Sequence, residues 1–174
     1  GVLYYETIFF FNFKIDTTKK YNKLGLLKET INNDKNYIFS VNSLCQLMKK
    51  EYNVDLMTIQ NHFSRDYNPE VNYDVMRMFV DEIGKYCYIV ILYCNPLPPD
   101  GDFYPRRLIY IDGNTGEILC EEEIFLWLLG GENIPKSKSS FPSKEEYLKK
   151  IKRTPKTTTF NGKTYTEEEW KAFE

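Results

Sequence analysis

The sequence predicts an α+β fold: an antiparallel sheet of about four strands with helices packed on one face, plus a small C-terminal appendage. Two observations support this class. Apolar residues make up 42% of the 174 residues and aromatic residues 16%, which is enough to build a core at this length. In the predicted hairpin strands late in the chain, apolar residues alternate with polar ones. This alternation fits an antiparallel sheet that is covered on one face better than a doubly wound sheet.

Four segments are predicted to form the sheet. Leu3–Phe13 is rich in aromatic and β-branched residues and is predicted to be a buried strand. Lys85–Asn95 has the strongest strand pattern, a long run of Tyr, Cys, Ile, Val and Leu. Arg106–Asp112 and Glu117–Glu122 are predicted to pair as a hairpin, because Asn and Gly in the turn at 113–116 supply positive φ values.

Helical spacing and end signals predict helices between these strands. Leu24, Leu27 and Ile31 lie at helical spacing after a possible cap at Thr17 or Thr18. Asn53 can end a second helix because Asn tolerates the left-handed conformation. The predicted helices cover residues 19–31, 43–52, 55–64 and a stretch from Asn72 or Asp74 to Ile83 that Gly84 ends.

The predicted domain organisation is a core at 1–130, a linker at 131–142 and an appendage at 143–174. The linker contains glycines and then a Pro, Lys and Ser stretch. In the appendage, Ser143 and Glu146 form a capping box that starts a helix to about Lys152. A small hairpin is predicted around Asn161-Gly162, and a second capping box at Thr166 starts a final helix.

The charge pattern gives no global field that would attract nucleic acid, since the net charge is −2. Residues 131–174 nevertheless carry 10 Lys and Arg against 7 Asp and Glu. This basic part is either a solvated tail or a docking surface for an anionic partner. No run is long enough to span a membrane, and the sequence sets no oligomeric state.

The cysteines indicate a reducing compartment. Cys45, Cys87, Cys94 and Cys120 form no CxxC pair and lie among apolar neighbours, so buried free thiols are expected and zinc is not. The first residues lack the features of a signal peptide, which favours a cytoplasmic location. Export stays open if a leader was removed before Gly1, and Cys120 would then be able to pair with Cys87 or Cys94.

Residues 43–65 have the spacing of a helix-turn-helix. The run from Val54 to Phe63 resembles the second half of bacterial helix-turn-helix repressors, which implies duplex DNA as a partner. Against it, Asn53 replaces the usual turn Gly, Lys49 replaces a small residue, and the local positive charge is weak. Any two packed amphipathic helices show similar spacing. The candidate DNA-binding residues are Lys49, Thr58, Gln60, Asn61, His62 and Arg65.

Residues 72–122 combine a predicted helix, a long strand and a closing hairpin that runs from Leu108 to Leu119 with an Asp-Gly-Asn-Thr-Gly-Glu turn. This arrangement resembles the PepSY family and related cystatin-like modules, in which a helix leans on a small antiparallel sheet. Such modules are usually inhibitory or interaction domains, so the resemblance implies a non-catalytic role.

The loop at 95–105 is a candidate protein-binding site because it is long and rich in Pro. Its candidate contact residues are Leu97, Phe103 and Tyr104. A packed surface loop is the alternative.

No catalytic or cofactor motif is present. His62 is the only histidine and has no nucleophile at a fitting spacing, and there is no phosphate-binding loop. The turn after Asp112 lacks the ligands of a calcium loop. The sequence therefore predicts a non-enzymatic binding or regulatory protein, with no cofactor or metal, that binds another protein through the sheet face and the 95–105 loop. A DNA-binding regulator and an enzyme with a carboxylate-lined cleft are the alternatives. The acidic run Glu121–Glu123 is itself typical of a solvated strand end.

Overall fold

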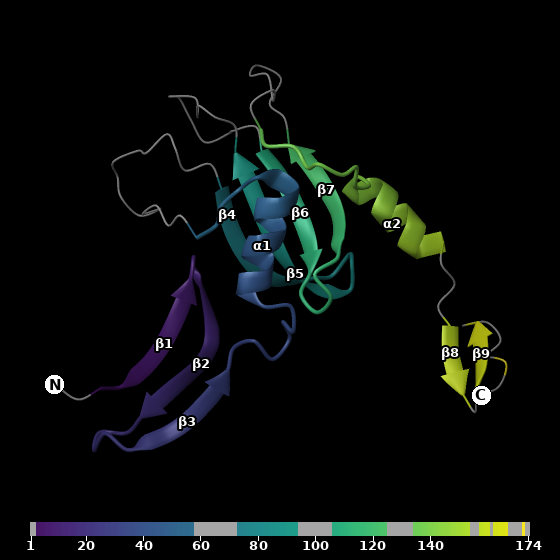
Figure 1. The fold of residues 1–174 in the computed structure, drawn as a ribbon. Coiled ribbons are helices and arrows are strands. Elements are labelled where there is room, and N and C mark those ends of the chain that lie inside the picture. Colours follow the sequence, from purple (N-terminus) through teal and green to yellow (C-terminus); the bar gives the residue numbers. More distant parts are fainter. Residues whose placement is uncertain are drawn as a thin grey trace.

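The fold is known from a computed structural model that describes residues 3–57, 73–93, 106–124, 134–153, 157–160, 162–166 and 172. Within these residues it contains two helices and three antiparallel sheets of three, four and two strands (Figure 1). The predicted α+β class is confirmed.

The four-stranded main sheet has the order β4-β5-β6-β7, and each strand pairs antiparallel with the next. The predicted strand after Lys85 and the predicted hairpin around the 113–116 turn are confirmed. The turn closes as expected, because Gly116 adopts a φ of +75°. The strands are β4 (Tyr73–Val80), β5 (Lys85–Tyr93), β6 (Arg106–Asp112) and β7 (Ile118–Ile124).

The first strand of the main sheet, β4, lies where a helix was predicted, and that prediction is wrong. It pairs with β5 along its whole length, from Tyr73 opposite Leu92 to Val80 opposite Lys85. Continuous cross-strand pairing with a buried neighbour outweighs the high helix propensity of its Met and Arg residues. Gly84, predicted to end a helix, instead closes the β4–β5 turn with a φ of +72°.

A separate N-terminal sheet has the order β1-β2-β3. The single buried strand predicted over 3–13 is wrong, because Phe11 and Asn12 form a turn between two strands and most of β1 is exposed. The helix predicted over 19–31 is also wrong, because this stretch ends one strand, turns at Gly25 and forms the next. The strands are β1 (Tyr5–Phe10), β2 (Phe13–Tyr21) and β3 (Leu27–Asn32).

Helix α1 (Val41–Tyr52) covers one face of the main sheet, as Figure 1 shows. It begins at the cap Ser40, whose side chain accepts a hydrogen bond from the Ser43 N–H at 3.1 Å. It ends at Asn53, which is left-handed with a φ of 58°, so the predicted helix and its stop are confirmed. Its buried side chains pack in the same core as alternate residues of β5 and β6, namely Tyr88, Val90, Leu92, Ile109 and Ile111.

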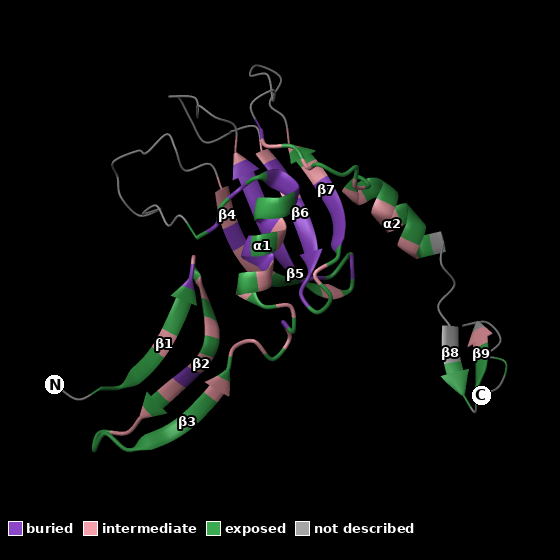
Figure 2. Ribbon diagram, viewed as in Figure 1, coloured by how far each residue is buried: buried purple, intermediate pink, exposed green. Residues whose placement is uncertain are grey.

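Helix α2 (Lys144–Arg153) packs against a second apolar cluster, which includes Cys87, Ile89 and Tyr110 of the main sheet. Its predicted capping box is confirmed: Glu146 accepts a hydrogen bond from the Ser143 N–H at 2.9 Å, and Ser143 accepts one from the Glu146 N–H at 3.2 Å. Both clusters lie against the purple, buried strands of Figure 2.

Part of the segment predicted as a linker packs on the core. Ile134 is buried in the same cluster as α1, and the Lys138 N–H donates to the Glu51 carbonyl at 2.8 Å. Glu121 of β7 donates its N–H to the Pro142 carbonyl at 3.0 Å, so this segment lies along the outer edge of β7. The boundary between a core and an appendage stays a prediction.

The third sheet is the predicted hairpin of β8 (Thr157–Phe160) and β9 (Lys163–Thr166), with Gly162 at a φ of +76°. This prediction is confirmed. The helix predicted to start at Thr166 lies outside the described residues. Of the helix predicted over 55–64, only residues 55–57 are described, and they are not helical.

Candidate functional site

The outer strand of the N-terminal sheet carries large apolar side chains that face solvent. Tyr5, Ile8 and Phe9 of β1 are 58%, 53% and 55% exposed, and Leu3 and Tyr4 just before the strand are exposed as well. In Figure 2, β1 is green along most of its length, whereas the strands of the main sheet are mostly purple. Large apolar side chains at this density, interrupted only by Glu6 and Thr7, are typical of a strand that is covered by another surface.

The strand register distributes these side chains over both faces of the sheet. Phe9 is opposite Lys14, and the Lys14 Nζ lies 5.9 Å from the centroid of the Tyr5 ring, which places Tyr5 and Phe9 on one face. Ile8 lies on the other face, opposite Ile15. Both faces of β1 are therefore apolar.

The backbone of β1 is also open on its outer side. Phe10 and Phe13 flank the two-residue turn, and such a pair exchanges both backbone hydrogen bonds. Inward and outward positions alternate along a strand, so Tyr5, Thr7 and Phe9 direct their N–H and C=O groups away from β2. Among the described residues, no strand pairs with this side of β1. We call these three backbones, with the side chains of Tyr5, Ile8 and Phe9, the β1 edge.

Three other sheet edges, those of β3, β4 and β7, carry charged residues or are covered. Strand β3 carries exposed Lys28 and Glu29, and β4 carries Asp74 and Arg77. The edge of β7 is covered by the segment that contains Pro142. Charged side chains on an edge oppose pairing with another chain, and β1 has only one, Glu6.

The N-terminal sheet is attached to the rest of the protein at one end. Phe10 is buried in the core cluster around α1, and Phe13 and Ile15 pack against the same cluster. Beyond this apolar end the sheet extends away from the main sheet (Figure 1). The β1 edge is therefore held out from the core.

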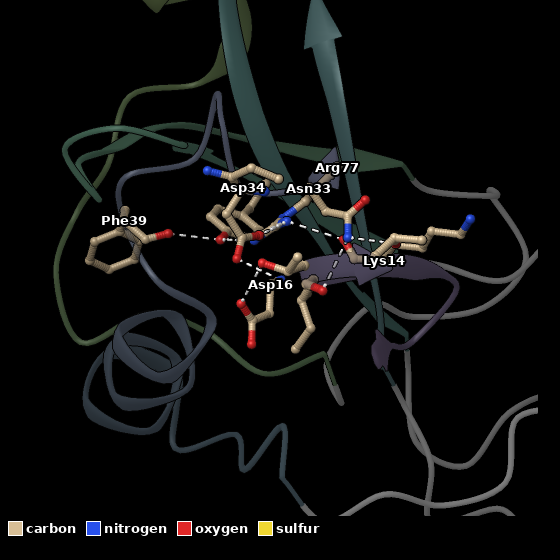
Figure 3. A network of polar contacts seen from close by, with 11 residues as sticks. Lys14, Asp16, Asn33, Asp34, Phe39 and Arg77 are labelled. Carbon is tan, nitrogen blue, oxygen red and sulfur yellow. Dashed lines mark hydrogen bonds and ion pairs between the residues drawn. The ribbon is translucent and has the colours of Figure 1, made fainter. Parts of the chain in front are cut away.

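Arg77 of β4 links the two sheets. Its Nη1 donates to the Asp34 Oδ1 at 2.5 Å, and its Nη2 donates to the Tyr88 hydroxyl at 2.6 Å. Figure 3 shows Arg77 beside Asp34 and the backbone of Lys14, whose carbonyl accepts from Nη1 at 3.4 Å. The guanidinium carbon also lies 4.7, 4.3 and 4.9 Å from the ring centroids of Phe13, Tyr37 and Tyr88.

We call this group the Arg77 clamp. A guanidinium enclosed by three rings and a carboxylate gains cation–π attraction and a charge-assisted hydrogen bond, which together offset the cost of burying its charge. Asp34 extends the link, because its Oδ2 accepts a hydrogen bond from the Asp16 N–H at 2.7 Å. Asp16 has a φ of 55°, at the bulge in β2. The clamp therefore fixes the N-terminal sheet at the point where β2 bends.

The three adjacent carboxylates of β7, which the sequence suggested to be a solvated strand end, each have a partner. Glu121 is buried, accepts a hydrogen bond from the Tyr52 hydroxyl at 2.6 Å and forms an ion pair with Arg107. Glu123 also pairs with Arg107. Burial, and then the hydrogen bond to Glu121, raise the pKa of Tyr52 far above its usual range.

The middle carboxylate points to the other face. Glu122 accepts a hydrogen bond from the Tyr110 hydroxyl at 2.9 Å and lies 3.7 Å from the Lys144 Nζ. Burial, and then this hydrogen bond, raise the pKa of Tyr110 to about 12. The three carboxylates thus divide between two networks, which tie α1 and α2 to β7. The prediction of a carboxylate-lined cleft is not tested by this arrangement.

Asp112 holds the β6–β7 turn. Its Oδ1 accepts from the backbone N–H groups of Asn114 and Thr115 at 2.8 and 3.3 Å, and its Oδ2 lies 2.5 Å from the Lys85 Nζ. These are the backbone contacts of an ordinary Asx-type turn, with an added ion pair to β5. Within the described ranges, no group of His, Cys, Asp and Glu is arranged to hold a metal ion.

Most of the predicted site residues lie outside the described residues. This is true of Leu97, Phe103 and Tyr104 in the 95–105 loop, and of Thr58, Gln60, Asn61, His62 and Arg65 in the helix-turn-helix candidate. Lys49 is described: it is exposed on α1, with its Nζ 4.0 Å from the Asp55 carboxylate. The protein-binding loop and the DNA-binding surface stay predictions.

Comparisons of the chain with protein-family models, with curated proteins and with solved structures found no match. The resemblance of residues 72–122 to PepSY and cystatin-like modules therefore stays a prediction. None of the helices in the described part of the chain is long and apolar enough to cross a membrane.

Sequence reasoning missed the β1 edge and the Arg77 clamp. The aromatic run at 3–13 predicts a strand, but its composition is the same as that of a buried strand. The sequence therefore does not indicate that this strand is exposed. Arg77 lies between Met76 and Met78 in an apolar stretch. A single arginine within such a run is the signal that would have indicated a buried, paired cation.

Proposed function

We propose that this protein is a non-enzymatic binding protein that contacts another polypeptide chain through the β1 edge. The observation that carries the proposal is an exposed strand that is apolar on both faces and has open backbone groups on its outer side. Strand addition to a sheet edge is a common mode of protein recognition, in which backbone hydrogen bonds give affinity and side chains give specificity.

The attachment of the N-terminal sheet supports this role. The edge is built on a three-stranded sheet, and the Arg77 clamp and the buried Phe10 fix that sheet to the core. An edge that is already ordered loses little conformational entropy when a partner binds, so more of the contact energy appears as affinity. The predicted 95–105 loop remains a candidate for a second contact.

A site-specific photo-crosslinker tests the proposal. Benzoylphenylalanine placed at Phe9 is expected to form discrete adducts with a protein in cells that express the chain from its own gene. The matched control is Leu27 on β3, the opposite edge of the same sheet, which is 57% exposed against 55% for Phe9. Crosslinking confined to Phe9 supports the proposal, and the same weak adducts at both positions, or none at either, contradict it.

A further inference from the structure

We propose that the chain bound at the β1 edge is a second copy of this protein, joined by antiparallel pairing of β1 with β1 into one continuous sheet of six strands, three from each copy. This inference rests on the proposed function and names its partner. It follows from three properties of the edge: its backbone positions, its side chains and its charge.

The backbone positions select one register. Tyr5, Thr7 and Phe9 are the outward-facing residues of β1, and a twofold axis at Thr7 pairs all of them at once. Tyr5 then lies opposite Phe9 of the second copy, Thr7 opposite Thr7, and Phe9 opposite Tyr5. Each of these is a hydrogen-bonded pair, so the interface gains roughly six backbone hydrogen bonds. A shift of the axis to a neighbouring position leaves one outward residue of the strand without a partner within β1.

The side chains fit the same register. Residues directly opposite each other in an antiparallel pair lie on the same face, so two aromatic pairs of Tyr5 with Phe9 form side by side. The exposed rings of Tyr5 and Phe9 would then contact one another. Aromatic cross-strand pairs are among the more stabilising contacts in a sheet.

The charge of the edge removes the usual obstacle to self-association. Glu6 is the only charged residue of β1, and its side chain already contacts Lys19 and Tyr21 of its own sheet. In the register centred on Thr7, Glu6 lies opposite Ile8 of the second copy. In the register centred on Glu6, the two carboxylates would face each other, which is unfavourable.

The open edges of two other strands, β3 and β4, are poorer partners for β1. Strand β3 brings Lys28 and Glu29, and β4 brings Asp74 and the buried Arg77. Pairing with either would place charged residues opposite the apolar side chains of β1, which is less favourable than pairing of apolar residues. A second β1 has the same length as the first and lacks the additional charges of β3 and β4.

Sedimentation velocity of the purified full chain, over a concentration range of about a thousandfold, measures the association. The unmodified protein is expected to form dimers, and Phe9→Lys is expected to weaken dimerisation by at least about tenfold, because two lysines replace two buried rings. The control Leu27→Lys, on the opposite edge, is expected to dimerise as the unmodified protein does. Circular dichroism establishes that both variants keep the fold.

The register is tested independently by disulfide trapping in a Cys94→Ser background. Thr7→Cys places two thiols on the twofold axis, at a spacing that suits a disulfide, and is expected to form a covalent dimer on mild oxidation. Tyr5→Cys is the control, since its two thiols would be separated by about 14 Å along the strand. This assay also decides the matter if Phe9→Lys fails to fold.

The outcomes separate this inference from the proposed function. A monomer at all concentrations, or a dimer that Phe9→Lys leaves intact, overturns the β1–β1 pairing. If such a monomer still gives Phe9 crosslinks to a different protein, the proposed function stands with another partner. If it gives none, both proposals fail. Equal trapping of Thr7→Cys and Tyr5→Cys overturns the register and with it the argument for a second copy.

Discussion

At the scale of single residues, Gly116 shows how a turn determines its surroundings. Its φ of +75° favours glycine, and a Cβ at this position would lie 2.2 Å from the nearest atom of the Phe39 ring. The carbonyl of Phe39 accepts a hydrogen bond from the Tyr88 hydroxyl at 2.8 Å, and Tyr88 belongs to the Arg77 clamp. The absent side chain thus leaves room for a residue that supports the clamp.

Gly116→Ala is expected to destabilise the protein more than Gly25→Ala does. Gly25 has nearly the same φ, +76°, but nothing lies within 4 Å of a Cβ there. Gly25→Ala therefore measures the backbone strain alone, about 1 kcal/mol, and Gly116→Ala adds the displacement of Phe39, about 1–3 kcal/mol more. Urea unfolding of both variants gives the two free energies. Equal losses would show that the ring moves aside at no cost.

Residues whose role depends on their own backbone were predictable, and residues whose role depends on distant partners were not. Asn53 and Gly116 act through positive φ, which their residue types signal directly. Arg77 and Arg107 act through carboxylates and rings that the fold brings to them, so their types alone favoured a solvated surface.

At the scale of elements, the Arg77 clamp holds two sheets together through one side chain. Asp34 and the Lys14 carbonyl belong to the N-terminal part, and Tyr88 belongs to the main sheet. The planar guanidinium contacts all of them and the rings in between. A lysine has neither the plane nor the paired donors needed for this arrangement.

Arg77→Lys is expected to loosen the N-terminal sheet while leaving the main sheet intact. Amide hydrogen exchange should accelerate in β2 and β3, and exchange in β5 and β6 should change much less. The overall loss in unfolding free energy should be about 2 kcal/mol. Lys35→Arg, at an exposed position in the same turn region, serves as the control and should change neither. Uniform acceleration in both sheets would argue against a local link.

The elements predicted correctly have local signals, and the errors have a common cause. The capping box at Ser143 and the Asn161-Gly162 turn identify their helix and hairpin without tertiary information. Residues 19–31 and 73–80 combine helix-like spacing with residues that also suit strands. In both stretches, pairing with a neighbouring strand determined the structure. The sequence of one segment alone does not show whether a partner strand will lie beside it.

At the scale of the whole molecule, the core protects its thiols. Cys45, Cys87 and Cys120 are buried and free, as expected from their apolar neighbours. Burial is the main cause that raises their pKa values, to about 11 for Cys45 and Cys87 and about 12 for Cys120. Because the thiolate is the reactive form, both the core and the raised pKa oppose modification.

Iodoacetamide at pH 8 is therefore expected to leave these three thiols unmodified in the native Cys94→Ser protein and to modify all of them in urea. Since the folded pKa of each thiol is raised, its contribution to stability is present below the unfolded value of 9.0. That contribution is lost as the pH rises through about 11 for Cys45 and Cys87 and about 12 for Cys120. Mass spectrometry of the labelled peptides gives the extent at each pH. Rapid native labelling at pH 8 would contradict a closed core around these residues.

The exposure of the β1 edge depends on the topology of the whole molecule, so only part of the candidate site was predictable from the sequence. The strand-forming composition of residues 3–13 was apparent, and it led to the right kind of element. Whether such a strand is buried in its own chain or left at an edge depends on how many other strands reach it. That number follows from the whole topology; among the strands that the structure describes, β1 pairs only with β2.

The contacts that fix the N-terminal sheet also impose an order on biosynthesis. Lys14 and Asp34 leave the ribosome well before Arg77 and Tyr88, with α1 between them in the chain. Because its own contacts are local, the three-stranded sheet can form first, while the apolar end at Phe10 and Phe13 has no core to enter. A nascent chain that stops short of β5 therefore exposes both this end and the β1 edge. It has more exposed apolar surface, and a greater tendency to aggregate, than the finished protein.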